Sequence, residues 1–293
     1  MLIATLIAAD QLEKGELSSA ADRLAEAGAR IERIGEIIDG KAGDIFCQGD
    51  IKALRKALPI EETAIDFVVQ PVENREKKLL ISDMDSTMIT VECIDELAGY
   101  AGIKDQIAEI TERAMLGELD FEEALRGRVA LLAGLEISAI DRCLQEKVEI
   151  MPGAKILVRT MASRGAKTIL VSGGFTRFAD PVARDIGFDC AEANILAEND
   201  ALLTGKLAGS IVDAQRKAEL LRQSAQSAGL SLAQCMAVGD GANDIPMIAL
   251  AGTGVAYRAK PKAAAAADVA IRHNDLSALL YMQGIGSREW TID

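Results

Sequence analysis

The chain has 293 residues, which is room for two domains, and 49% of them are hydrophobic, enough for a sizeable core. A formal net charge of −13 argues against nucleic acid or an anionic membrane surface as a partner, and no apolar run reaches the roughly 18–20 residues of a membrane span. One histidine and five scattered cysteines argue against a Ser-His-Asp triad, a zinc site and a disulfide framework, and they predict a reduced, cytoplasmic protein.

The first 70 residues predict a small α+β domain. Alternating apolar residues, helical spacing and turn residues indicate strands and helices in the order βαββαβ. The expected elements are 1–9, 17–27, 30–38, 44–48, 51–58 and 64–70. This order is typical of a ferredoxin-like fold. The charged stretch 71–78 is the expected linker to the next domain.

From Leu79 to Asp293 the pattern changes to apolar strands that alternate with longer helices, which predicts a Rossmann-like α/β domain with a mostly parallel sheet. The expected strands are 79–82, 168–171, one near 190, 235–238, 254–257 and 269–271, with a hairpin at 195–209. The expected helices are 153–164, 178–186, 214–229, 245–250 and 263–267. A helical insert at about 92–149, with helices at 107–115, 121–132 and 138–147, is expected to form a cap over the active edge of the sheet.

Two aspartates follow the first strand of this domain. Asp83 and Asp85 are two residues apart, so in an extended chain their side chains point to the same side, just past the carboxyl end of a strand. Carboxylates this close repel each other unless a cation or a shared proton intervenes. The pair therefore predicts a divalent-metal site with one reactive carboxylate, although two solvated aspartates at a strand end would give the same pattern.

Three later stretches end at the same predicted edge. Ser172, Gly173 and Gly174 offer a hydroxyl and bare backbone N–H groups for an anion, and Lys217 offers a cation. The third stretch places acidic residues among glycines, which suits Mg²⁺ because this ion prefers oxygen ligands. Its polar members are Asp240, Asn243 and Asp244. Taken singly, the glycine pair is an ordinary turn and the lysine an ordinary surface charge, but together the stretches predict phosphoryl transfer.

These four stretches, in this order, resemble the motifs of the haloacid dehalogenase superfamily. Within it, residues 79 to about 280 closely resemble the phosphoserine phosphatase family, and the predicted cap shares its acid and arginine. The resemblance implies that Glu92 and Arg128 hold the ammonium and carboxylate of O-phospho-L-serine, and that Met115 and Phe121 are apolar lining of the closed cap. Surface charge and core packing are the alternative readings of these four residues.

The resemblance also implies a mechanism. Asp83 attacks phosphorus and becomes an aspartyl-phosphate, while Asp85 protonates the leaving serine oxygen and then activates water. Mg²⁺ is implied on the Asp83 carboxylate, the Asp85 backbone carbonyl and Asp240. The residues implied to hold the phosphoryl oxygens are Ser172, Gly173 and Lys217, with Asn243 orienting the phosphate and Asp244 holding the waters of the metal or Lys217. The products are serine and phosphate, which implies the last step of serine biosynthesis.

The N-terminal domain resembles ACT-like modules, which implies amino-acid binding or a homodimer, with a purely structural role as an equal alternative. Two further alternatives concern the whole chain. One is a related enzyme that acts on phosphothreonine or transfers phosphate to homoserine. The other is a sensor without catalysis, which the intact set of acidic residues and Lys217 disfavours.

Overall fold

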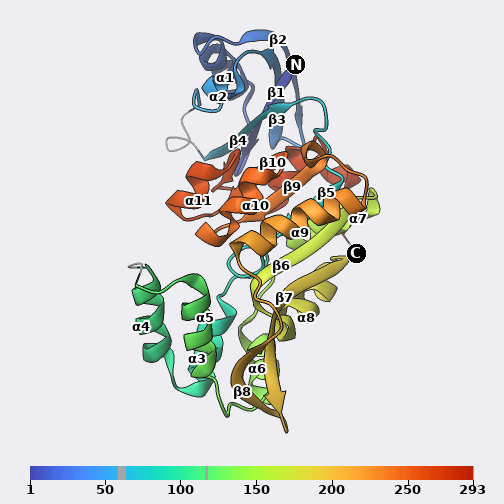
Figure 1. Ribbon diagram of the computed structural model, residues 1–293. Helices are drawn as coiled ribbons and strands as arrows, with labels where there is room; N and C mark the ends of the chain where they lie inside the picture. The colour runs from blue at the N-terminus through green and yellow to red at the C-terminus, as the bar shows by residue number, and fades with distance from the viewer. Residues whose placement is uncertain (59–63, 116–117, 293) are drawn as a thin grey trace.

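The computed structural model describes residues 1–58, 64–115 and 118–292. It contains a four-stranded sheet near the N-terminus and a seven-stranded sheet that forms the core. In Figure 1 the N-terminal unit lies above the core sheet, and a group of helices and a long hairpin lie below it. No helix in the described part of the chain is both long and apolar enough to cross a membrane.

The N-terminal unit has the predicted βαββαβ order. Its elements are β1 (Leu2–Ala8), α1 (Lys14–Glu26), β2 (Arg30–Ile38), β3 (Ala42–Gln48), α2 (Ile51–Leu54) and β4 (Ile65–Pro71). The sheet has the order β2-β3-β1-β4, and its strands pair antiparallel. Helix α1 begins three residues before the predicted start, where the Glu16 carboxylate accepts a hydrogen bond from the Glu13 N–H (2.8 Å). Helix α2 ends four residues before the predicted end, and Pro59, its expected terminator, lies outside the described residues.

The second face of this small sheet packs against the core. Ile7, Ala42 and Val68 belong to the same buried apolar cluster as the core helices. Polar contacts fix the junction. The buried Asp66 carboxylate accepts hydrogen bonds from the backbone N–H groups of the three residues that follow β11, Arg272 to Asn274, and from the side-chain amide of Asn274. Arg75 pairs with Asp44 at 2.7 Å and also donates to the Met282 carbonyl. The N-terminal unit is therefore tied to the core by buried contacts.

The core sheet has the order β11-β10-β9-β5-β6-β7-β8, and all neighbouring strands are parallel except β7 and β8. Its strands are β5 (Leu79–Ser82), β6 (Lys167–Phe175), β7 (Cys190–Asn199), β8 (Leu202–Ala208), β9 (Cys235–Gly239), β10 (Thr253–Tyr257) and β11 (Val269–Ile271). The helices around it are α7 (Ala154–Ser163), α8 (Thr176–Ile186), α9 (Ala214–Ser227), α10 (Ile245–Leu250), α11 (Pro261–Ala266) and α12 (Ala278–Tyr281). Three short 3₁₀ turns are Leu232–Gln234, Ala242–Asp244 and Ser287–Glu289. The predicted α/β fold and the separate antiparallel sheet are confirmed.

Strand β5 lies in the middle of the core sheet and is buried on both faces. Leu79 and Ile81 pack in the cluster that contains α9 and α10, whereas Leu80 packs in the cluster that contains α7 and α8. Burial on both faces explains the continuous apolar run in the sequence. From β5 the chain builds β6 and β7 on one side, and it later builds β9, β10 and β11 on the other. The strand order reverses between β5 and β9, and ligands of open α/β sheets bind outside the carboxyl ends at such a point.

In its described residues, the insert between β5 and α7 contains four helices, hereafter the cap. They are α3 (Cys93–Ala101), α4 (Lys104–Met115), α5 (Phe121–Ala130) and α6 (Ser138–Lys147). The last three were predicted, with α6 at its predicted bounds, whereas α3 was not specified within the expected insert. Helix α3 ends at Gly102, whose φ of 69° favours glycine.

The cap is attached to the hairpin formed by β7 and β8 (Figure 1). Backbone N–H groups of Gly134 and Ile137 donate to carbonyls of the hairpin at 2.8 and 2.9 Å, and the Leu203 N–H donates to the Leu135 carbonyl at 2.9 Å. The prediction of two separate strands in this region was wrong, because β7 runs without a break from Cys190 to Asn199 and itself forms the first arm of the hairpin.

Candidate active site

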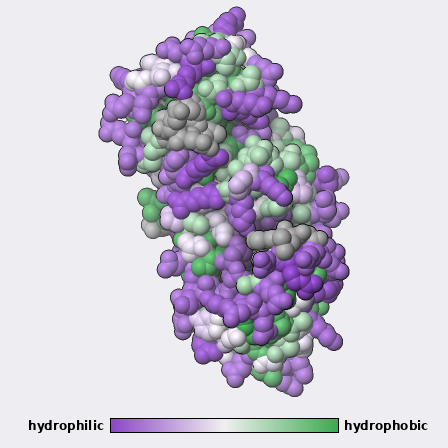
Figure 2. Space-filling view, turned by 90° about the vertical axis from the view of Figure 1, so that its left-hand side faces the viewer, coloured by the Kyte–Doolittle hydropathy of each residue, from purple (hydrophilic) through white to green (hydrophobic). Residues whose placement is uncertain are grey.

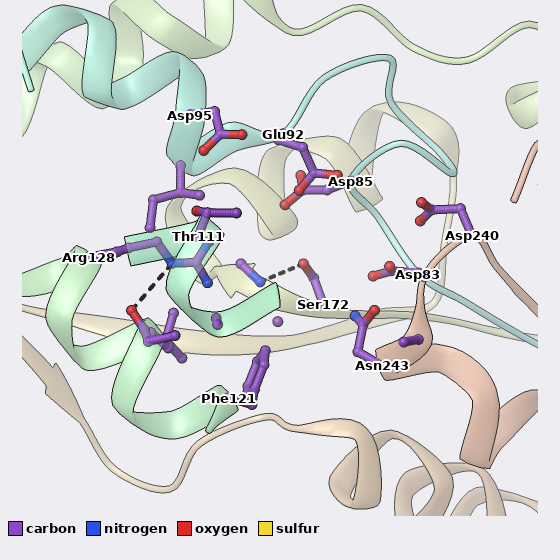
Figure 3. A pocket seen from close by; sticks show the side chains of 18 of the residues that line it. Asp83, Asp85, Glu92, Asp95, Thr111, Phe121, Arg128, Ser172, Asp240 and Asn243 are labelled. Atoms are coloured by element: carbon purple, nitrogen blue, oxygen red, sulfur yellow. Dashed lines mark hydrogen bonds between the residues drawn. The ribbon is translucent and has the colours of Figure 1, made fainter. Parts of the chain in front are cut away.

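The carboxyl ends of β5 and β9 bring the first and last predicted motifs together. Asp83 directly follows β5, and its N–H donates to the Val238 carbonyl of β9 at 2.9 Å. Asp240 directly follows β9, and the carboxylates of both aspartates lie at the same edge in Figure 3. This is the point at which the strand order reverses, so the sheet topology itself positions both side chains.

Lys217 reaches this edge from the first turns of α9 and is fully buried. Its Nζ lies 2.7 Å from the Asp83 carboxylate and 2.8 Å from the Asp244 carboxylate. Burial opposes the charge of Lys217, but the two carboxylates outweigh it and hold the pKa above its usual value. The lysine is therefore a fixed cation directly beside Asp83.

Three carboxylates crowd around this single lysine. Asp83, Asp240 and Asp244 each have an oxygen within 4.8 Å of the others. Burial, followed by the neighbouring Asp244 carboxylate, raises the pKa of Asp83 and raises that of Asp240 to about 6. With three carboxylates and one lysine the cluster carries a net negative charge, so the donor set fits a hard divalent cation.

Asp244 differs from the other two carboxylates because protein groups already engage both of its oxygens. One accepts from Lys217, and the other accepts from the N–H groups of Asp240 (3.1 Å) and Gly241 (2.9 Å). Asp244 was predicted to hold either the waters of the metal or Lys217, and this arrangement suits the second role. The bonds to the N–H groups of Asp240 and Gly241, which also hold the loop of Asp240, were not predicted. The predicted contribution of Asp85 to the metal is a backbone carbonyl, and it stays a prediction.

Asp85 lies in the turn after β5, next to Ser86, whose φ of 57° is unusual for a residue other than glycine. Its Oδ1 is buried and has no hydrogen-bond partner in the described residues. Burial, followed by the nearby Glu92 carboxylate, raises the pKa of Asp85 to about 7. A carboxyl group with this pKa can both donate and accept a proton near neutral pH.

Strand β6 approaches Asp85 closely at Gly174. A Cβ atom at this position would lie 3.1 Å from Asp85 Oδ2 and 3.0 Å from Ser172 Oγ, so glycine permits the contact. The stretch from Ser172 to Gly174 was predicted as a loop after a strand that ends at 171. It instead belongs to β6, which continues to Phe175 with a shift in its pairing to β7.

Asn194, on β7, was missed by the sequence reasoning. Its amide Nδ2 donates to the Gly173 carbonyl at 2.8 Å, and its Oδ1 accepts from the Val212 N–H at 2.8 Å. The side chain is buried and fixes the peptide of Gly173. No motif marks this residue, since it is a single asparagine within a strand.

A cavity of about 600 Å³ separates the core edge from the cap, and Figure 3 shows its lining. The cap contributes Glu92, Phe121 and Arg128 to it. Arg128 donates only to the Ala124 carbonyl (3.3 Å) among the contacts of the described residues, whereas one Glu92 oxygen accepts from Ser86 Oγ (2.7 Å). The structure thus brings the predicted cap residues to the same cavity as the core residues.

Of the other predicted site residues, Ser172, Gly173 and Asn243 also line the cavity. The side chain of Met115, at the end of α4, lies outside the described residues, so its predicted role is untested. The sequence reasoning named none of the other polar lining residues. These are Asp95, Thr111, Lys260 and Lys262.

Comparison with known proteins agrees with this geometry. The family of haloacid dehalogenase-like hydrolases matches residues 77–252, which include Asp83, Lys217 and Asp240. The chain belongs to the haloacid dehalogenase-like hydrolases.

Two relatives and one solved structure of similar fold are named as phosphoserine phosphatases. A phosphoserine phosphatase of Streptomyces coelicolor is 42% identical over 276 residues, which are 92% of this chain and 67% of that protein. A phosphoserine phosphatase of Saccharomyces cerevisiae is 37% identical over 289 residues, which are 94% of this chain and 93% of the relative. The solved structure of a probable phosphoserine phosphatase from Vibrio cholerae, unliganded, matches with a TM-score of 0.78 and 33% identity, covering 96% of this chain and 86% of that one. Its family and these relatives make this hydrolase a phosphatase.

Proposed function

We propose that this chain hydrolyses O-phospho-L-serine to L-serine and inorganic phosphate with Mg²⁺ as its cofactor. One observation carries the proposal: a single cavity has Asp83, Asp85 and Asp240 at its core edge and Glu92 with Arg128 at its cap edge. Lys217 is buried directly beside Asp83, 2.7 Å from its carboxylate. The names of the relatives support the same substrate.

The two ends of the cavity match the two ends of this substrate in charge. Arg128 has N–H groups free of ion pairs among the described residues, and a guanidinium binds a carboxylate through two parallel hydrogen bonds. Glu92 offers a carboxylate oxygen to the ammonium. A cavity of about 600 Å³ is of the size that holds a small ligand.

In the proposed reaction Asp83 attacks phosphorus, and the bond from phosphorus to the serine oxygen breaks. Asp85 donates its proton to the departing oxygen and then takes a proton from the water that hydrolyses the aspartyl-phosphate. The pKa of about 7 lets Asp85 perform both transfers. Ser172, the Gly173 N–H and Lys217 are proposed to hold the phosphoryl oxygens, with Asn243 orienting the phosphate.

The proposed metal ligands are the carboxylates of Asp83 and Asp240 and the backbone carbonyl of Asp85. Bound there, Mg²⁺ would neutralise charge on a phosphoryl oxygen and between the crowded carboxylates. Asp244 is proposed to act through Lys217 and the loop of Asp240, because its oxygens already have partners.

The cellular location, the pathway and the division into domains are also proposed. We infer a cytoplasmic location, supported by five cysteines without disulfides, and a role in the last step of serine biosynthesis. The division into an ACT-like domain (1–70), a linker (71–78) and a phosphatase domain (79–293) is supported by the separate sheets. We infer that the ACT-like domain binds serine or pairs with the same domain of a second copy of the chain.

Phosphate release from O-phospho-L-serine, with and without Mg²⁺, tests the proposal. Release that requires Mg²⁺ and disappears in Asp83→Asn is the expected result. Faster turnover of O-phosphothreonine, or transfer of phosphate to homoserine, would reassign the substrate. Absence of release from any phosphate monoester would support an amino-acid sensor instead.

A further inference from the structure

The cavity holds more negative than positive side chains. Besides the proposed ligands and Asp85, its lining includes Glu92 and Asp95, both on the cap. Lys217 lies behind Asp83 and is already paired with two carboxylates. Arg128 faces the cap end, where it serves the substrate carboxylate in the proposed function. The five carboxylates of the lining outnumber the positive charges of Arg128 and one bound Mg²⁺ together, so a phosphate group with two negative charges needs further cations to enter this cavity, in a protein with a net charge of −13.

Two exposed lysines provide the remaining positive charge in the lining. Lys260 directly precedes α11 and Lys262 lies in its first turn, and both residues line the cavity. Neither forms an ion pair with another described residue. Both belong to the core side of the cavity, the side that holds the proposed phosphate site.

The backbone around Lys260 is fixed against the proposed metal site. Its N–H donates to the Asp240 carbonyl at 3.0 Å, and its carbonyl accepts from the Ala264 N–H at 3.0 Å. Two residues earlier, Arg258 has a φ of 44°, a conformation that costs about 1–2 kcal/mol for a residue with a side chain. Its N–H bond to the Ile271 carbonyl (2.8 Å) holds that turn. These backbone hydrogen bonds therefore fix the position of Lys260 at the edge of the cavity.

The surface around the mouth is polar. Figure 2 views the molecule from the left-hand side of Figure 1, the side on which α4 and α11 lie. Hydrophilic residues dominate this face, and hydrophobic residues form small separate groups on it. Charge, rather than an apolar patch, is what this face offers to an approaching molecule.

We propose that Lys260 and Lys262 guide the phosphate end of the substrate into the cavity and contact inorganic phosphate as it leaves. They take part in no bond-making step. The inference rests on the proposed function, since it concerns access to that same site. Lysine suits this task because its ammonium is a mobile point charge, whereas the buried Lys217 is fixed in place.

The test compares two double variants that each lose two positive charges. Lys260→Gln with Lys262→Gln removes the proposed guides, and Lys14→Gln with Lys52→Gln removes exposed lysines of the N-terminal unit. At about 20 mM salt, kcat/KM for O-phospho-L-serine is expected to fall about tenfold in the first variant relative to the second, with kcat changed less than about twofold. The difference should shrink to about twofold at about 0.5 M salt, because ions screen exposed charges.

Binding of inorganic phosphate, measured by titration calorimetry with Mg²⁺ present, gives a second readout. It should weaken about tenfold at low salt in the first variant and stay unchanged in the control. Equal kcat/KM and equal phosphate affinity in the two variants would overturn the inference, as would a loss confined to kcat. If the wild type does not hydrolyse O-phospho-L-serine, the proposed function fails, whereas phosphate affinity and turnover of p-nitrophenyl phosphate still decide the role of the lysines.

Discussion

Gly174→Ala tests whether the close contact between β6 and Asp85 matters for catalysis. The added methyl group would lie 3.0 Å from Ser172 Oγ and 3.1 Å from Asp85 Oδ2, where ordinary contacts begin at 3.4 Å. One of these side chains must therefore move by a few tenths of an ångström. Gly174 does not have a positive φ, so alanine is compatible with the backbone, and the effect is local.

The magnitude follows from this displacement. A misplacement of about 1 Å in a reacting group costs about 100-fold in rate, so a few tenths should lower kcat for O-phospho-L-serine about tenfold, or by about 1.4 kcal/mol. Hydrolysis of p-nitrophenyl phosphate should fall less, because its leaving group needs no proton from Asp85, which then acts only in activating water.

Initial rates with both substrates measure the effect, and thermal melting checks the fold. Gly15→Ala is the matched control, since a Cβ at this helical position meets nothing within 4 Å. An unchanged kcat in Gly174→Ala would refute the reasoning. An equal loss with both substrates would also refute it, because a step common to both would then have changed rather than protonation of the leaving oxygen.

Three further results are expected. Arg128→Ala should raise KM for O-phospho-L-serine at least about tenfold but leave KM for O-phosphoethanolamine, which has no carboxylate, unchanged; equal effects contradict the assignment. Since burial and Glu92 raise the pKa of Asp85 to about 7, kcat for O-phospho-L-serine should decline above about that pH as the proton is lost, whereas p-nitrophenyl phosphate should show no such decline. Asp66→Asn should lower the free energy of unfolding by about 3 kcal/mol, because the backbone N–H groups of Arg272, His273 and Asn274 lose a buried carboxylate. Urea unfolding, followed by the fluorescence of the single tryptophan, measures this free energy, and a loss under about 1 kcal/mol contradicts the expectation.

Much of the fold could be predicted because its strands carry strong local signals. Strand β2 and helices α6 and α10 have their predicted bounds, and the apolar run at β5 reflects burial on both faces. The predicted break near residue 195 was wrong because polar residues interrupt the apolar pattern of β7, whose pairing with β6 and then with β8 decides its length. Local propensity does not report such tertiary pairing.

Some residues of the candidate site could likewise be predicted from local signals in the sequence, and others could not. Asp83, Lys217 and Asp240 could be predicted because strand ends and motif order mark them, and the structure brings all three to one edge. Asn194 and Lys260 could not, because their positions depend on contacts with Gly173 and Asp240, which are distant in the sequence. The buried junction through Asp66 likewise joins residues about 200 positions apart, so no local pattern predicts it.

The backbone bonds between Gly134, Leu135, Ile137 and the hairpin have a mechanical consequence. They hold one flank of the cap against the outermost strand of the core sheet, so a rotation of the cap about that flank moves helix α4, which lies on the opposite side of the cap in Figure 1, the farthest. Two of these bonds also occupy the N–H and the carbonyl of Leu203 on the outer edge of β8, where they would otherwise be open to pairing with another chain. The three bonds thus set the pivot of the cap and cover the start of this edge strand.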